Sequence, residues 1–326
     1  MDDTAESQRI DPSDPPTYTV PADIITLIIS QVEDSKTLLS LCLTNHFVGY
    51  EARRKLYQEL DSHPRLPEFH VKCLSSLVSN QTLPPLVRRF SLLQMTRRPR
   101  CTEERLRELI PEDEETDYTK RGILFEQLLS ILLRKALPRM VNLKELSFGS
   151  PRPVGREMGD LLLDPEGGDS ALFQLRMLCW NDCWNGSLID FVKRQKGLRV
   201  LALGMVWCSS DSIIEHRMPQ EICDGLTTIS GDQRVVEALL PFAPGVKSVV
   251  LHVGRLKDQR GVFGPTVDLK PTGRLAKAMP QLTRLVLRNY TTRTPIFTFG
   301  LEAMSGLKVL VVDCLLDEHE AVSFFL

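Results

Sequence analysis

The stretch Leu198-Arg199-Val200-Leu201-Ala202-Leu203 carries apolar residues in the spacing L-x-x-L-x-L, and variants of this spacing recur along the chain. With any apolar residue allowed, the pattern occurs clearly six times. The six copies are Leu143-Leu146-Phe148, Leu175-Leu178-Trp180, Leu198-Leu201-Leu203, Val246-Val249-Leu251, Leu282-Leu285-Leu287 and Leu307-Leu310-Val312. Apolar alternation at the end of each copy predicts a short strand. Recurrence at this frequency is typical of a repeat architecture.

Two weaker copies, Val87-Phe90-Leu92 and Leu226-Ile229-Gly231, extend the series. The middle residues then stand at 90, 146, 178, 201, 229, 249, 285 and 310, in steps of 56, 32, 23, 28, 20, 36 and 25 residues. Helical patterns lie between several copies, at 122–135, 233–240 and 274–279. Strands that alternate with helices or loops predict an α/β fold with a parallel sheet. A compact α/β domain with parallel strands is the competing interpretation.

The recurring pattern resembles the leucine-rich-repeat family over roughly residues 83–326, which implies an irregular solenoid. The Asn or Cys that this family carries three places after the last strand leucine is met clearly only by Cys183. Residues 321–326 lack the polar cap that a terminal repeat needs, which favours an array that is cut short.

The N-terminal region is organised differently. Residues 1–17 are polar and proline-rich, which predicts a disordered leader. Pro21 suits the first turn of a helix, and the apolar residues of 24–32 recur at helical spacing. Asp34 or Ser35 is expected to cap a second helix around 38–42, and a third helix is expected over 47–57. Three short helices bury little surface, so a module of this size usually needs a partner.

Residues 21–34 (PADIITLIISQVED), 38–45 (LLSLCLTN), Phe47 and 52–57 (ARRKLY) resemble the F-box, particularly its fungal versions. The match covers about 40 of 326 residues. Val20, Asp23 and Phe47 stand where the family commonly has Leu, Glu and Trp, and each change keeps the chemistry. Any small amphipathic three-helix segment shares some of these features, which is the alternative interpretation.

The two resemblances imply four regions: a leader (1–17), an F-box module (18–60), a connecting helical segment (61–82) and a leucine-rich-repeat-like array (83–326). They imply a substrate-recognition adaptor of an SCF-type cullin–RING ubiquitin ligase, in which the F-box docks on a Skp-type adaptor, through it on a cullin, and the repeats bind a protein substrate. The expected Skp contacts are Pro21, Ile24, Ile28, Leu38, Leu39 and Leu41. The alternative function is a repeat scaffold that recruits no ligase.

A charge pattern accompanies the repeats. The residue after the first apolar position is basic in five of the six clear copies: Lys144, Arg176, Arg199, Lys247 and Lys308, with Thr283 in the sixth. Parallel stacking would align these residues along one edge of the sheet, about 4.8 Å apart. Glu145 lies beside Lys144 and is expected to relieve its charge. We therefore expect the concave face to bind an acidic or phosphorylated segment, although a plain solubilising role is the commoner one. Trp184 and Trp207 are tentative substrate contacts.

No sequence feature predicts catalysis. The chain lacks G-x-S-x-G, P-loop and G-x-G-x-x-G motifs, so we expect a non-catalytic adaptor without cofactors. Cys179 and Cys183 come closest to a metal pair, but the rest of a zinc motif is missing. Eight scattered cysteines and the absence of a secretory signal indicate a reducing compartment, cytoplasmic or nuclear. A net charge of -2 gives no global attraction to nucleic acid or membranes.

Overall fold

The protein forms two compact units, Met1–Leu56 and Tyr57–Leu326, each with its own hydrophobic core. The structure is a computed structural model. It describes residues 20–61, 67–92, 121–149, 173–181, 186–203, 220–252, 281–290, 305–314 and 322–325. Residues 57–60, which the sequence analysis included in the helical module, fall in the second unit.

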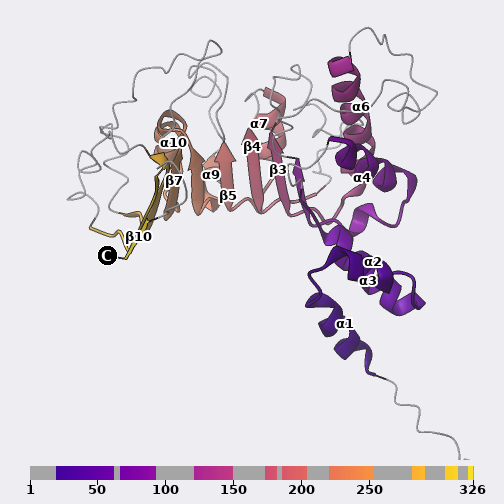
Figure 1. The fold of residues 1–326 in the computed structure, drawn as a ribbon. Coiled ribbons are helices and arrows are strands. Elements are labelled where there is room, and N and C mark those ends of the chain that lie inside the picture. Colours follow the sequence, from indigo (N-terminus) through magenta and orange to yellow (C-terminus); the bar gives the residue numbers. More distant parts are fainter. Residues whose placement is uncertain are drawn as a thin grey trace, which may run out of the picture. The chain divides into compact units, whose positions relative to one another are not determined.

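The described part of the first unit contains α1 (Ala22–Ser30), α2 (Ser35–Leu41) and all but the last two residues of α3 (His46–Gln58) (Figure 1). Pro21 precedes α1, and its carbonyl accepts the first helical hydrogen bonds. Asp34 caps α2, because its carboxylate accepts hydrogen bonds from the backbone N–H groups of Thr37 at 2.9 Å and Lys36 at 3.3 Å. Asn45 caps α3 by accepting from the N–H of Val48 at 2.9 Å. Side-chain caps therefore fix where the second and third helices begin.

The core of the first unit is small. Only Ile29, Leu38 and Ala52 are buried apolar residues there, a statement limited to its described residues, 20–56. The partly buried residues that pack around them are Ile25, Val32, Leu41, Cys42, Val48 and Leu56. A core of this size provides little stability by itself, because so few side chains leave water completely.

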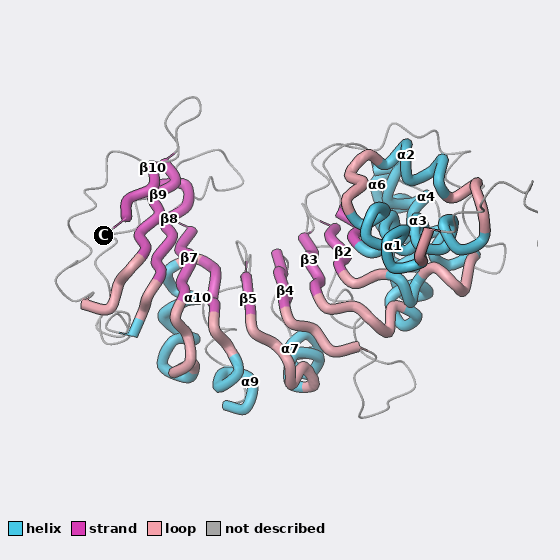
Figure 2. Tube along the Cα trace, turned by 90° about the horizontal axis from the view of Figure 1, so that it is seen from below, coloured by secondary structure: helices cyan, strands magenta, loops and turns pink. Residues whose placement is uncertain are grey.

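The second unit is built on a sheet whose strands follow one another in chain order (Figure 2). The strands are β1 (Glu59–Asp61), β2 (Arg89–Leu92), β3 (Glu145–Gly149), β4 (Met177–Asn181), β5 (Val200–Leu203), β6 (Thr228–Gly231), β7 (Ser248–His252), β8 (Arg284–Tyr290), β9 (Val309–Cys314) and β10 (Val322–Phe325). Strands β1 to β9 pair in parallel, and β10 pairs antiparallel with β9.

The strand register follows the sequence pattern. The middle apolar residues of all eight copies occupy equivalent positions on adjacent strands, in the order Phe90, Leu146, Leu178, Leu201, Ile229, Val249, Leu285 and Leu310. The two weaker copies are therefore true members of the series. Residues with even numbers on β3 face the core, whereas Glu145 and Ser147 are only partly buried on the opposite face. We call this second face of the sheet the open face.

Helices join successive strands and pack on the core face of the sheet. They are α4 (Pro67–Ser79), α6 (Arg121–Ala136), α7 (Gly186–Lys193), α9 (Gln220–Gly225) and α10 (Gln233–Leu239), with short 3-10 helices at Pro84–Leu86, Leu137–Arg139 and Leu240–Phe242. α4 packs against α6, and α10 packs against β6 and β7. The predicted helices at 122–135 and 233–240 are present, whereas the one at 274–279 lies outside the described residues.

One continuous hydrophobic core runs through the second unit. The first apolar residue of each copy is buried from Val87 to Leu282, and Leu307 is partly buried. Phe148 and Trp180 occupy the third position of neighbouring copies, and their ring centroids lie 4.9 Å apart. The predicted α/β class is therefore confirmed. The sequence analysis did not anticipate β1, β10, α7 or α9.

Candidate functional site

The outer side of α1 is apolar and exposed. Ile24, Leu27 and Ile28 have exposed fractions of 46%, 59% and 57%. They are spaced three and four residues apart, so they share one side of the helix. Ile25 and Ile29 occupy the other side and pack in the core of the unit. α1 thus has two apolar sides, and the structure gives only one of them a partner inside the unit. We call Ile24, Leu27 and Ile28 the α1 outer row.

A second group of exposed apolar residues comes from α2, the following turn and α3. Leu39 is 58% exposed and Leu43 is 86% exposed. Phe47 and Tyr50, near the start of α3, are also exposed. We call Leu39, Leu43, Phe47 and Tyr50 the α2–α3 exposed set. Of these four residues, the sequence analysis named only Leu39 as a contact.

The structure divides the six expected Skp contacts. Pro21, Ile24, Ile28 and Leu39 are exposed, and Leu41 is partly buried. Leu38 lies in the core with Ile29 and Ala52 and is only 4% exposed. Its predicted role as a direct contact therefore does not fit the fold, because α2 turns Leu38 inward and Leu39 outward. Leu38 is a core residue that supports the surface beside it.

The second unit aligns the basic residues that the repeat pattern singled out. Each stands immediately before a strand, at the amino-terminal edge of the sheet. Backbone hydrogen bonds connect them in sequence: the N–H of Arg176 donates to the carbonyl of Lys144 at 2.7 Å, and the N–H of Arg199 donates to that of Arg176 at 2.8 Å. The chain of bonds continues through Thr227, Lys247 and Thr283 to Lys308.

Arg88 extends this alignment by one strand, because its carbonyl accepts from the N–H of Lys144 at 2.8 Å. We call Arg88, Lys144, Arg176, Arg199, Lys247 and Lys308 the basic row. All are exposed except Lys144, which is partly buried. Two unit charges at this strand spacing repel each other by about 0.9 kcal/mol in water before salt screening. The row is therefore a mildly unfavourable arrangement unless an anion lies beside it.

Glu145 does not relieve the charge of Lys144. It bonds instead to Arg89 on the neighbouring strand, with Nε to Oε2 at 2.6 Å, and Arg89 also contacts Glu59 at 3.3 Å. The expectation that Glu145 would relieve the charge of Lys144 was wrong. Successive residues of a strand point to opposite sides, whereas residues opposite each other on adjacent strands point to the same side and can pair. Among the described residues, none of the six members of the basic row forms an ion pair.

The open face carries a polar cluster that the sequence analysis missed. Ser230 Oγ on β6 lies 3.0 Å from His252 Nε2 on β7, and Arg288 is the register neighbour of His252 on β8. Burial lowers the pKa of His252, Arg288 lowers it further, and Asp232 acts in the opposite direction. Asp232 also caps α10 through the N–H of Val235 at 2.9 Å. Ser230, His252 and Arg288 belong to separate copies of the pattern. The cluster could therefore be found only from the strand register, which places these residues on neighbouring strands.

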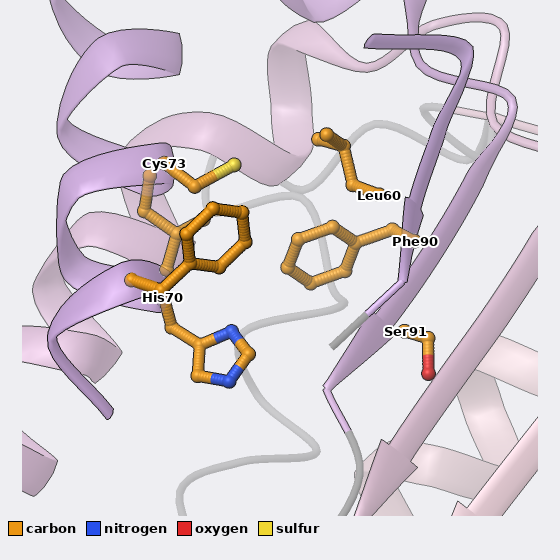
Figure 3. Close-up of a pocket in the computed structure, with 7 residues that line it drawn as sticks. Leu60, His70, Cys73, Phe90 and Ser91 are labelled. Carbon is orange, nitrogen blue, oxygen red and sulfur yellow. The ribbon is translucent and has the colours of Figure 1, made fainter. Parts of the chain in front are cut away.

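A small hollow lies between α4 and the first two strands (Figure 3). His70 and Cys73 of α4 face Leu60 of β1 and Phe90 of β2 across it. The cavity volume of about 10 Å³ suits at most one water molecule. Burial lowers the pKa of His70 and raises that of the Cys73 thiol to about 11, so the thiol keeps its proton at neutral pH.

The remaining predicted sites are the two tryptophans and the cysteine pair considered for a metal. Trp184, Trp207 and Cys183 lie outside the described residues. Cys42, Cys73, Cys179 and Cys223 are free thiols, and the described part of the chain contains no group of three metal-binding side chains. Burial raises the pKa of Cys179, although a hydrogen bond with Ser147 opposes this.

Within the described ranges, no helix has the length and apolar character needed to cross a membrane. No protein-family model matches the chain, and a search of curated proteins finds no significant match. Any functional assignment therefore depends on the residues and geometry described above.

Proposed function

We propose that the protein is a substrate-recognition adaptor of an SCF-type cullin–RING ubiquitin ligase. Residues 20–56 act as an F-box that docks on a Skp-type adaptor, and the second unit acts as an irregular leucine-rich-repeat array that binds the substrate protein. The observation that carries the proposal is the amount of apolar surface that the three-helix unit leaves exposed. A small unit with a minimal core gains stability from covering such surface with a partner.

The size of this surface agrees with a docking role. Burying an aliphatic side chain completely is worth roughly 1.5–3 kcal/mol, so a half-exposed one contributes about 1 kcal/mol. The α1 outer row with Leu39 would supply about 4 kcal/mol, which is too little for a stable complex. Covering the rest of the α2–α3 exposed set and Val20 roughly doubles this gross value, from which the cost of association is subtracted, so a partner that covers more of the exposed surface binds more tightly.

The second unit supports the repeat assignment through its regularity. Nine parallel strands in chain order, with equivalent apolar residues in register, match the stacking expected of repeats that each add one strand. Such arrays present one face of the sheet and its edge to a partner. The function would need no chemistry from this chain, because holding a substrate near a charged ubiquitin-conjugating enzyme raises its effective concentration.

The test is binding of the purified chain to a purified fungal Skp-type adaptor, measured by calorimetry. Ile28→Lys and Leu39→Lys each place a charge on exposed apolar surface, so they should weaken binding at least about tenfold without unfolding the unit. Gln31→Lys, at the end of α1, and Ser40→Lys, within α2, add the same charge at exposed polar positions and should leave binding unchanged.

Two outcomes would end the proposal. If the double variant Ile28→Lys, Leu39→Lys binds the adaptor as tightly as the wild type, residues 20–56 do not dock as an F-box. If the wild type itself shows no binding, the scaffold that recruits no ligase becomes the better description.

A further inference from the structure

We infer that the basic row is the docking site for an acidic polypeptide segment of the substrate, one that carries carboxylate or phosphate groups. This inference rests on the proposed function in one respect, since it names the chemical class of the substrate. Its geometry, however, belongs entirely to the second unit.

The densest part of the basic row spans four consecutive strands. Arg88, Lys144, Arg176 and Arg199 precede β2, β3, β4 and β5 with no neutral residue between them. Further along, Thr227 and Thr283 alternate with Lys247 and Lys308. At about 4.8 Å per strand, the four cations span about 14 Å, which is the length of four to five residues of extended chain. An extended acidic segment therefore matches this part of the edge.

The contrast with Arg89 shows that the basic row differs from ordinary charged surface. Arg89 follows Arg88 directly and is neutralised by Glu59 on one side and Glu145 on the other. Arg89, the first residue of β2, thus has two acidic partners. Among the residues described, no member of the basic row has one. Arg176 and Arg199 present planar guanidinium groups that can bind a carboxylate or phosphate through two parallel hydrogen bonds.

The surroundings of the row favour polypeptide over nucleic acid. Met177 and Val200, the partly buried first residues of β4 and β5, come next to Arg176 and Arg199. They offer apolar contacts to side chains that alternate with acidic ones. None of the first strand residues from β1 to β9 is aromatic, whereas single-stranded nucleic acids bind where aromatic rings accompany the cations. The net charge of -2 also gives no long-range attraction to a polyanion.

The experiment measures binding of three fluorescein-labelled ten-residue peptides by anisotropy. The probes are decaglutamate, a Gly-Ser peptide with phosphoserine at alternate positions, and decaglutamine as the neutral reference. We expect one or both acidic peptides to bind the full chain, with affinity falling at least about tenfold between 0.05 and 0.5 M salt. The two acidic probes distinguish a preference for carboxylate from one for phosphate.

Charge reversal locates the site. Arg176→Glu combined with Arg199→Glu should weaken acidic-peptide binding at least about tenfold, because two charge-assisted contacts are lost. Arg134→Glu combined with Lys193→Glu makes the same change in net charge at exposed positions on α6 and α7 that are not members of the basic row, and should leave binding unchanged. The Arg176, Arg199 variant should still bind the Skp-type adaptor, and the Ile28→Lys variant should still bind acidic peptides.

The inference is overturned if neither acidic peptide binds more tightly than decaglutamine, or if both double variants weaken binding equally. Tighter binding of a ten-nucleotide single strand than of either acidic peptide would also overturn it and would assign the edge to nucleic acid. A chain that binds the adaptor but no acidic peptide retains the proposed function and loses only this inference.

Discussion

Gly49 on α3 lies so close to α2 that a methyl group on it would stand 2.9 Å from the carbonyl oxygen of Cys42. That oxygen belongs to the backbone, so it cannot move aside as a flexible side chain would. The contact shows that α2 and α3 pack at the closest distance that a glycine allows, and it makes Gly49 a sensitive probe of the first unit.

Gly49→Ala is therefore expected to destabilise the first unit by roughly 1–3 kcal/mol through overpacking. The direction of the change in stability is informative, because Gly→Ala at a helix position with free space around it stabilises the fold by about 1 kcal/mol. Hydrogen exchange of the α2 and α3 amides, followed by mass spectrometry, measures the loss. Gly186→Ala at the start of α7 is the control, since nothing lies within 4 Å of the added methyl group. Protection that is unchanged by Gly49→Ala would contradict the described packing.

Gln195 provides a second test, in the second unit. Its side chain is fully buried, and its Oε1 accepts from the backbone N–H of Leu175 at 2.8 Å. Gln195→Ala would leave that buried N–H without an acceptor and should cost about 1–3 kcal/mol of unfolding free energy. Gln174→Ala removes a bond between the same two segments, from Nε2 to the carbonyl of Arg194 at 3.1 Å, but at an exposed position. It should change stability by less than about 0.5 kcal/mol. Equal losses in urea unfolding would refute this difference.

Two histidines of the second unit, His70 and His252, predict how stability depends on pH. Burial is the main cause that lowers the pKa of His70 and of His252 below the ordinary 6.5. The unfolded chain then binds more protons, so this contribution to stability is fully present above about pH 6.5 and is lost as pH falls through the folded pKa values. The melting temperature should stay level above neutrality and decline below pH 6.5. The variant His70→Gln, His252→Gln should show a shallower decline, and a slope identical to that of the wild type would argue against the prediction.

Thiol reactivity tests the burial of the cysteines. Burial raises the pKa of Cys73 and of Cys223 to about 11, from a reference of 9.0. Because only the thiolate reacts, alkylation at pH 8 should be about a hundredfold slower in the folded chain than in urea. Iodoacetamide labelling with peptide mass spectrometry measures each site separately. Native rates that equal those in urea would show that these thiols are accessible.

The sequence by itself determined strands β2 to β9 and their register. The spacing L-x-x-L-x-L places apolar side chains on one face of each copy, and a one-residue shift in pairing would expose them, so the anchors from Phe90 to Leu310 align as expected. The cap at Asp34 and the helix at 121–136 are local features of the same kind, because neighbouring residues supply their hydrogen bonds and apolar periodicity.

Only the tertiary structure decided which apolar residues remain at the surface. Leu38 and Leu39 are adjacent and identical in type, yet the first is 4% exposed and the second 58%, because α1 and α3 cover one side of α2. Strand pairing likewise decided that Glu145 forms an ion pair with Arg89 and not with Lys144. The antiparallel pairing of β10 with β9 lay equally beyond the repeat pattern. Local spacing specifies what a segment can form, whereas contacts between distant segments decide which of its sides is buried.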